Sequence, residues 1–169
     1  MTAAGENPEA SWRETSLRQI LLLLVLVGIA GLVAELLLLG HTESFNQWIP
    51  LIVLIVGILS TLVLMFRPGY RSIRVFQWVM ASFVMAGLLG LYLHYRGNVE
   101  FALERYPDAG GLSLAWKALR GATPTLAPGA LAQIGLLGLI YTYKHPALSD
   151  EAEGDTEGQG EVNRNGSDT

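Results

Sequence analysis

Residues 20–39 read ILLLLVLVGIAGLVAELLLL, a run of 20 residues in which Glu35 is the one charged side chain. An α-helix needs roughly 20 residues to cross about 30 Å of hydrocarbon. Backbone amides inside lipid must be hydrogen-bonded within their own segment, and a helix achieves this. The run is longer than the apolar part of a secretory signal, and leucines stand where cleavage needs small side chains. We therefore expect a retained transmembrane helix.

Three more apolar runs follow at 48–66, 75–95 and 126–143, and none of them contains Asp, Glu, Lys or Arg. A buried helix in a soluble protein explains one such run, but it does not explain four. Charged residues make up 15% of the chain, against about 25% in soluble domains. The sequence therefore predicts an all-α integral membrane protein with four transmembrane helices at about 20–39, 48–66, 75–95 and 126–143.

Basic residues are concentrated at one end of the predicted spans. Six lie there, namely Arg13, Arg18, Arg67, Arg71, Arg74 and Lys144. Four are spread over the loop 96–125, and none lies in 41–47. Because Lys and Arg favour the cytoplasmic side, we expect a multi-pass plasma-membrane protein with both termini in the cytoplasm. The basic loop RPGYRSIR at 67–74 suits anionic lipid headgroups, and nucleic-acid binding is not needed to explain it.

The chain divides into a cytoplasmic flank at 1–19, a membrane domain at 20–148 and a tail at 149–169. The tail has seven acidic residues, one basic residue and almost no large apolar side chains, so we expect it to be disordered. We interpret it as a solubilising tail, and the alternative is a tether for a basic partner. In the flank, SWRE at 11–14 fits a capping box, which predicts that the first helix begins at about residue 12.

The loop at 96–125 is long enough to form a small helical subdomain on the outer face. The third helix is predicted to continue to Arg105 and to stop at Tyr106, because Pro107 disfavours helical geometry in the residue before it. At 111–121, GLSLAWKALRG is predicted to form an amphipathic helix with an apolar face of Leu112, Ala115, Trp116 and Leu119. Such a helix either lies in the membrane interface or caps the outer mouth of the bundle, and the sequence favours neither.

Glu35 is the most informative candidate for a functional residue, because an ionisable group inside a span is costly and commonly functional. With Gly28 and Gly31 it forms a face of small residues plus one acid, which is predicted to point into the bundle. His94 is predicted to face it from the third helix. The candidates for an ion site or polar contact are Glu35, His94, Gln133 and His41.

The stretch LYLHYRGNVEFALERYP at 91–107 brings three metal-ligand residue types close in sequence, namely His94, Glu100 and Glu104. Helical spacing separates them, since His94 lies about 240° around the helix from Glu100. His94 instead shares its face with three residues further along the helix: Asn98, Phe101 and Arg105. We therefore expect no metal site here.

Catalytic signatures are missing from the sequence. It contains no cysteine, which excludes disulfides, thiolate metal sites and Cys nucleophiles. It has no phosphate-binding loop, zinc-protease motif or nucleophile elbow. The three histidines lie at span ends, which argues against haem. We expect no catalytic residues, no metal and no cofactor.

Small-residue faces recur in the third and fourth runs, at Gly87 and Gly90 and at Gly135 and Gly138. Such faces let membrane helices pack closely. We therefore expect a non-enzymatic accessory or scaffold protein that associates with other membrane proteins or with itself. A small transporter or proton- or cation-handling protein centred on Glu35 and His94 is the second hypothesis, and a membrane enzyme with an outer-face His/Glu site is the third. The overall pattern resembles small bacterial inner-membrane proteins, and no motif identifies a family.

Overall fold

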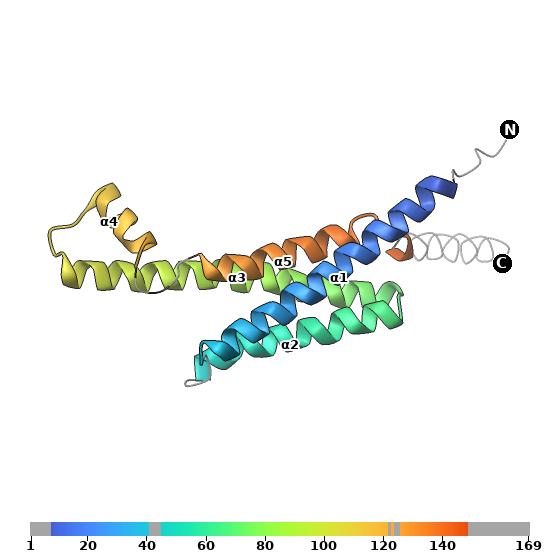
Figure 1. Cartoon of the computed structure of the whole chain (residues 1–169), viewed down its shortest axis with the longest axis horizontal. Coiled ribbons are helices and arrows are strands. Elements are labelled where there is room, and N and C mark those ends of the chain that lie inside the picture. The colour runs from blue at the N-terminus through green and yellow to red at the C-terminus, as the bar shows by residue number, and fades with distance from the viewer. Residues whose placement is uncertain (1–7, 41–44, 122, 124–125, 149–169) are drawn as a thin grey trace, which may run out of the picture.

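The computed structural model describes residues 8–40, 45–121, 123 and 126–148. These residues form five helices and no strand (Figure 1): α1 (Pro8–Leu38), α2 (Phe45–Phe66), α3 (Tyr70–Arg105), α4 (Gly111–Leu119) and α5 (Ala127–Thr142). The predictions for His41 and for the tail at 149–169 concern residues outside this set.

Three helices are long and apolar enough to cross a membrane: Thr15–Leu38 within α1, Gln47–Phe66 within α2, and α3. α5 is apolar but has 16 residues, so it is about 24 Å long, shorter than the hydrocarbon core of about 30 Å. Large apolar side chains lie exposed on the outer faces, including Leu24, Trp78 and Leu136. Such an outer surface suits lipid rather than water. The protein is thus an all-helical bundle with three candidate membrane-crossing helices.

α1 begins one turn earlier than the sequence predicts. Its first residue is Pro8, and proline suits a first helical position because its missing N–H would have no partner there. Ser11 therefore lies inside the helix and is not its N-cap, so the predicted capping box is wrong.

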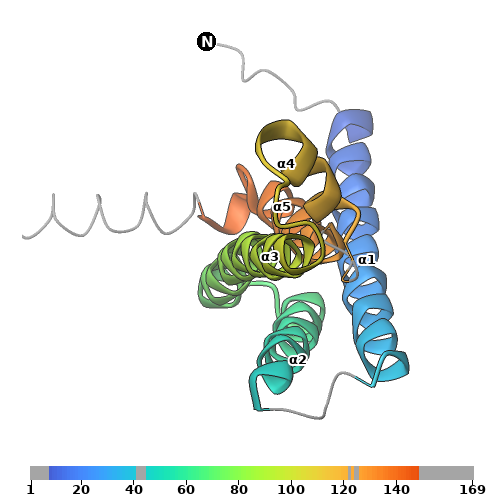
Figure 2. The same cartoon turned by 90° about the vertical axis from the view of Figure 1, so that its left-hand side faces the viewer.

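Four helices form a closed ring in which α1 and α3 each lie between α2 and α5. In the described part of the chain, no Cα atom of α1 lies within 8 Å of a Cα atom of α3, and the same is true of α2 and α5. Figure 2 views this arrangement along the bundle. The centre is filled by Ile29 of α1 and Phe83 of α3, which are fully buried and meet at Gly57 of α2.

α3 and α5 pack closely through glycines, as the small-residue faces predict. A Cβ on Gly135 would lie 2.6 Å from the carbonyl oxygen of Met80, and a Cβ on Gly87 would lie 2.6 Å from the backbone nitrogen of Ala132. No larger residue fits at either position without moving a backbone. The two helices are therefore fixed against each other.

α3 continues well past the start of α5. Gly90 lies against Pro128 in the first turn of α5, so the last fifteen residues of α3 extend beyond that helix. α3 ends at Arg105 with Tyr106 as its C-cap, which confirms the prediction made from Pro107.

α4 packs on this extension of α3 and not on the rest of the bundle. Its fully buried residue is Ala118. The predicted apolar face points outwards, because Leu112, Trp116 and Leu119 are 87%, 60% and 44% exposed. This face therefore does not cap the mouth of the bundle.

Candidate functional site

Glu35 lies on the outside of the bundle. Its side chain is exposed, and a Cβ on neighbouring Gly31 would meet nothing within 4 Å. Gly28 does face α5, since a Cβ added there would lie 3.0 Å from the side chain of Ile134. The predicted inward orientation of Gly31 and Glu35 is therefore wrong. The inward face of α1 is made instead by larger residues that fill the core, namely Leu22, Val25 and Ile29.

His94 and Glu35 do not form the predicted pair: they lie on α3 and α1, which are not neighbours in the ring, and Glu35 is exposed on the outside of the bundle. His94 sits on α3 between Gly90, which contacts Pro128, and Asn98. Its side chain is partly buried, and its buried Nδ1 has no hydrogen-bond partner among the described residues. His94 thus lies near the start of α5 rather than facing α1.

Gln133 also points away from the bundle. It is exposed on α5, on the same outer side as Leu136 and Ile140. Glu35, His94 and Gln133 therefore do not come together, and none of them lines either of the two clefts described below.

Asn98 holds the segment after α4 onto α3. Its side chain is 2% exposed. Its Nδ2 donates to the carbonyl oxygen of Thr123 at 2.7 Å, and its Oδ1 accepts from the Thr123 N–H at 3.2 Å and from the Thr123 hydroxyl at 2.8 Å. Gly121 presses against the same side chain, so a Cβ there would collide with it. This polar contact fixes the base of the α3–α4 pair.

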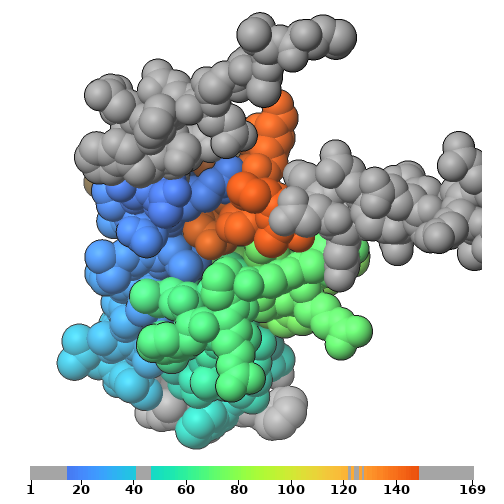
Figure 3. Space-filling view, turned by 90° about the vertical axis from the view of Figure 1, so that its right-hand side faces the viewer, coloured from blue at the N-terminus to red at the C-terminus, as the bar shows by residue number. Residues whose placement is uncertain are grey.

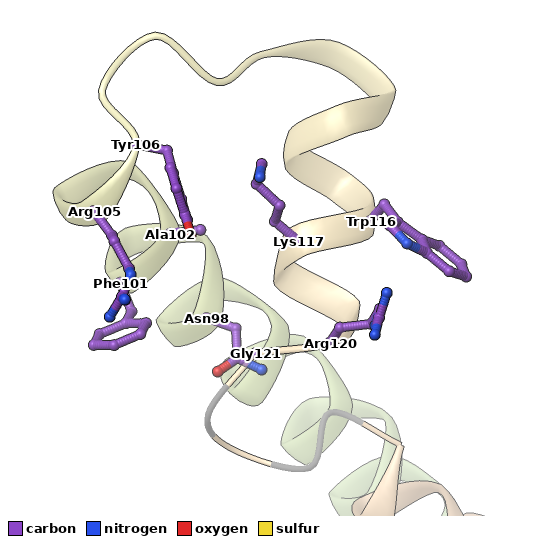
Figure 4. Close-up of a pocket in the computed structure, with 9 residues that line it drawn as sticks. All are labelled: Asn98, Phe101, Ala102, Arg105, Tyr106, Trp116, Lys117, Arg120 and Gly121. Carbon is purple, nitrogen blue, oxygen red and sulfur yellow. The ribbon is translucent and has the colours of Figure 1, made fainter.

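A cleft of about 490 Å³ opens between the extension of α3 and α4. We call it the α3–α4 cleft, and its described lining comprises Asn98, Phe101, Ala102, Arg105, Tyr106, Trp116, Lys117, Arg120 and Gly121. Figure 4 shows Lys117 reaching between the two helices towards Tyr106, with Arg105 on the α3 side and Arg120 on the α4 side. These lining residues include three cations and three aromatic rings, and none of them is acidic.

Arg18 ties the start of α1 to the end of α5. Its guanidinium donates to the carbonyl oxygens of Tyr141 at 2.8 Å, Tyr143 at 3.3 Å and Lys144 at 3.1 Å. The last carbonyls of a helix have no partner within it and carry partial negative charge. Arg18 satisfies one of them, that of Tyr141, together with two carbonyls just past the end of the helix, and it supplies the matching positive charge. Figure 3 shows α1 and the end of α5 adjoining at this end of the molecule.

A second cleft, of about 730 Å³, lies beside this contact, between the start of α1, the end of α2 and the end of α5. His145 lines it, with its Nδ1 accepting the Ala147 N–H at 3.3 Å. Burial, together with the charge of Arg18, lowers the pKa of His145 below 6.5. The neutral imidazole is therefore favoured at this end of the bundle.

The basic loop between α2 and α3 is open to its surroundings. Arg67, Arg71 and Arg74 are all exposed. Arg74 donates to Gln77 at 3.3 Å and lies 5.3 Å from the ring centre of Tyr70. Contact with lipid headgroups stays a prediction for these three side chains.

No group of three His, Asp or Glu side chains in the described part of the chain is placed to hold a metal ion. Glu100 pairs with Arg96 at 3.0 Å on the exposed face of α3. Exposed pairs of this kind contribute little to stability, because water and salt screen them. The carboxylates of the 91–107 stretch therefore lie on the outer face of α3, away from the α3–α4 cleft.

Two polar residues that organise the fold, Arg18 and Asn98, do not stand out as such in the sequence. Arg18 reads there only as one of several charges that set the topology, and its contacts are 123 to 126 residues away along the chain. Asn98 offers a local signal, since it shares a helical face with Phe101 and Arg105, and both of those residues line the cleft with it.

No family model, curated protein or solved structure matches this chain. The function is therefore inferred from the residues of the chain and their geometry alone.

Proposed function

We propose that this protein is a multi-pass inner-membrane accessory protein, without catalytic activity of its own, that binds another membrane protein through α1. The exposure of Glu35 within the apolar run of α1 carries the proposal. A carboxylate in that position is costly beside lipid, and no ion pair to it forms in the described part of the bundle.

The exposed side of α1 changes character along the helix. Near its start the exposed side chains are large: Ile20, Leu23, Leu24 and Val27. In the turn before Glu35 the exposed residues are small, namely Ala30, Gly31 and Ala34. Large side chains are exposed again after it, at Leu37 and Leu38. We call Glu35 and these three small residues the α1 patch. Small residues allow another helix to approach closely, and a polar side chain among them can hydrogen-bond across the contact.

The partner helix must supply a polar or basic side chain at the depth of Glu35. Glu35 lies four residues inside the end of the apolar run, about 6 Å below its boundary. A helix that presents a Lys, Arg or amide side chain at this depth satisfies the carboxylate. A symmetric pair of this chain with its axis at Glu35 would instead place Glu35 against Glu35, and like charges repel.

The proposed topology has four spans with both termini in the cytoplasm. The basic flanks support it, since Arg18, the α2–α3 loop at Pro68 and His145 all line one cleft at the same end of the bundle. α5 serves as the fourth span despite its length. Arg18 bonds the Tyr141 carbonyl in its last turn, and a short helix is accommodated by local thinning of the bilayer.

Purification in mild detergent tests the proposal. We expect a tagged chain to recover one membrane protein reproducibly, and Gly31→Leu and Glu35→Leu to release it. Gly31→Leu is informative because no described atom lies within 4 Å of a Cβ at that position, so the variant blocks an outside helix without disturbing the fold. Leu24→Phe adds bulk at the other end of the exposed side and is the matched control, which should retain the partner.

The opposite result is equally clear. If the chain purifies alone, and Glu35→Gln abolishes an ion flux in liposomes, the accessory function is wrong and ion handling replaces it. Recovery of a protein that Gly31→Leu and Glu35→Leu leave bound would likewise exclude the α1 patch.

A further inference from the structure

The α3–α4 cleft has the composition of an anion-binding site. Arg105, Lys117 and Arg120 are among its described lining residues, and none of those residues is acidic. None of the three cations forms a salt bridge in the described part of the chain, where Arg96 pairs with Glu100 instead. The described fold therefore leaves the positive charge of the cleft without a neutralising carboxylate.

The acidic residues of α3 lie on a different side of the helix. Phe101 and Arg105 are four residues apart and line the cleft together. Glu100 and Glu104 are each one residue earlier, which turns them about 100° away from that line. Both are exposed. The carboxylates of α3 thus lie off the line of residues that borders the cleft, and the buried residues on this part of α3 are Asn98 and Ala102.

Aromatic rings hold two of the cations without cancelling their charge. The Lys117 ammonium lies 4.0 Å from the ring centre of Tyr106, and the Arg120 guanidinium lies 5.9 Å from that of Trp116. A cation over a ring is positioned by the quadrupole of the ring and keeps its full charge. Arginine also presents paired N–H groups that match two oxygens of a phosphate.

The cleft begins where lipid headgroups begin. Asn98 lies three residues past Tyr95, the end of the apolar run, so it is about 5 Å beyond the hydrocarbon. The headgroup layer extends about 5–8 Å on each side of the hydrocarbon core. Gly121 contacts Asn98, which puts adjacent Arg120 at headgroup depth. Arg105, seven residues past Asn98, lies further into the water.

We propose that the α3–α4 cleft binds a phosphate-bearing anion. Lys117, which reaches between the two helices, contacts the phosphate, and Arg105 and Arg120, whose side chains extend outwards from α3 and α4, add positive charge at the two rims of the cleft (Figure 4). The same chemistry is offered by the headgroup of an acidic phospholipid, which enters at Arg120, and by a soluble phosphate, which enters at Arg105. This site is separate from the α1 patch and does not depend on it.

Trp116 provides a direct readout, because it lines the cleft and is 60% exposed. In a full-length variant with Trp12, Trp48 and Trp78 changed to Phe, its fluorescence is titrated in uncharged detergent. The probes are inorganic phosphate, short-chain phosphatidylglycerol and short-chain phosphatidylcholine. We expect a saturable change with phosphate or with phosphatidylglycerol, and none with phosphatidylcholine, which has no net charge.

Substitutions then locate the binding. Lys117→Gln and Arg120→Gln should each weaken it about tenfold or more, since a hydrogen bond to a charged group is worth about 1.5–3 kcal/mol. Lys117→Arg should retain it. Arg71→Gln, which removes an exposed cation outside the cleft, should leave it unchanged, and circular dichroism verifies that all four variants are folded.

The titration distinguishes a soluble phosphate compound from a lipid headgroup as the anion that the cleft binds. Saturation by inorganic phosphate assigns the site to a soluble phosphate compound, whereas saturation by phosphatidylglycerol alone assigns it to a lipid headgroup. The proposal is overturned if neither probe saturates, or if Arg71→Gln weakens binding as much as Lys117→Gln does.

Discussion

Asn98 and Thr123 form a reciprocal pair, in which the Asn98 amide donates to the Thr123 carbonyl at 2.7 Å and accepts from the Thr123 N–H at 3.2 Å. The pair joins α3 to the chain between α4 and α5. Asn98 is almost fully buried, whereas Thr123 is exposed, so the bonds lie at the edge of the packed region. The position of α4, and with it the α3–α4 cleft, depends on this contact.

Asn98→Leu should loosen α4 without unfolding the bundle. The change removes the side-chain partner of Thr123, and a typical hydrogen bond contributes about 0.5–1.5 kcal/mol. We expect faster hydrogen exchange across 111–121 and a lower unfolding temperature, with exchange in α2 unchanged. Equal exchange in the variant and the wild type across 111–121 would show that the pair does not hold α4.

His94→Leu should behave in the opposite way. Its buried Nδ1 has no hydrogen-bond partner in the described part of the chain, so an apolar side chain of similar size removes an unsatisfied polar group. Thermal unfolding in detergent should show an unchanged or higher midpoint. A loss as large as that of Asn98→Leu would mean that His94 makes a stabilising contact.

Alanine at a glycine between packed helices should lower the stability of the bundle, whereas alanine at a glycine on its outer surface should not. Gly135→Ala places a methyl group 2.6 Å from the Met80 carbonyl oxygen, and overpacking of this kind costs about 1–3 kcal/mol. Gly31→Ala meets no described atom within 4 Å and gains up to about 1 kcal/mol of helix propensity. Unfolding midpoints in the same detergent compare the two. Similar losses at both positions would contradict the outward orientation of Gly31.

The pKa of His145 is expected below 6.5, chiefly because of burial and secondarily because of Arg18. The unfolded chain then takes up the proton first as the pH falls, so the folded state loses stability below about pH 6.5. NMR titration should show Arg18→Gln raising the pKa of His145 without restoring the ordinary value, since burial remains. Arg71→Gln serves as the charge-matched control. A pKa of His145 at or above 6.5 in the wild type would refute this environment.

The helices are largely predictable from the sequence, because length, apolar composition and Pro107 act locally. The end of α3 at Arg105 and the close packing at Gly87 and Gly135 both agree with the sequence-based expectation. These features depend on residues near each other in the chain or on a property of one face.

The orientation of α1 could not be predicted in the same way. Its apolar run is leucine-rich on every side, so periodicity does not show which face is buried. The buried face of α1 is the one that carries Val25 and Ile29, which pack against other helices. Glu35 therefore lies on the outside. The Asn98–Thr123 and Arg18–Tyr141 contacts also join residues 25 and 123 positions apart, and spacing along one helix carries no information about such pairs.

Photo-crosslinking along α1 in living cells tests the central claim most directly. A photoreactive amino acid is placed at Gly31 and Ala34 in the α1 patch, at Leu23 on the same side, and at buried Val25. We predict crosslinks from Gly31 and Ala34 to one other membrane protein, in a segment with a Lys, Arg or amide side chain, and none from Leu23 or Val25. Crosslinks to lipid alone, equal crosslinking at all four positions, or crosslinks to a second copy of this chain would contradict the account.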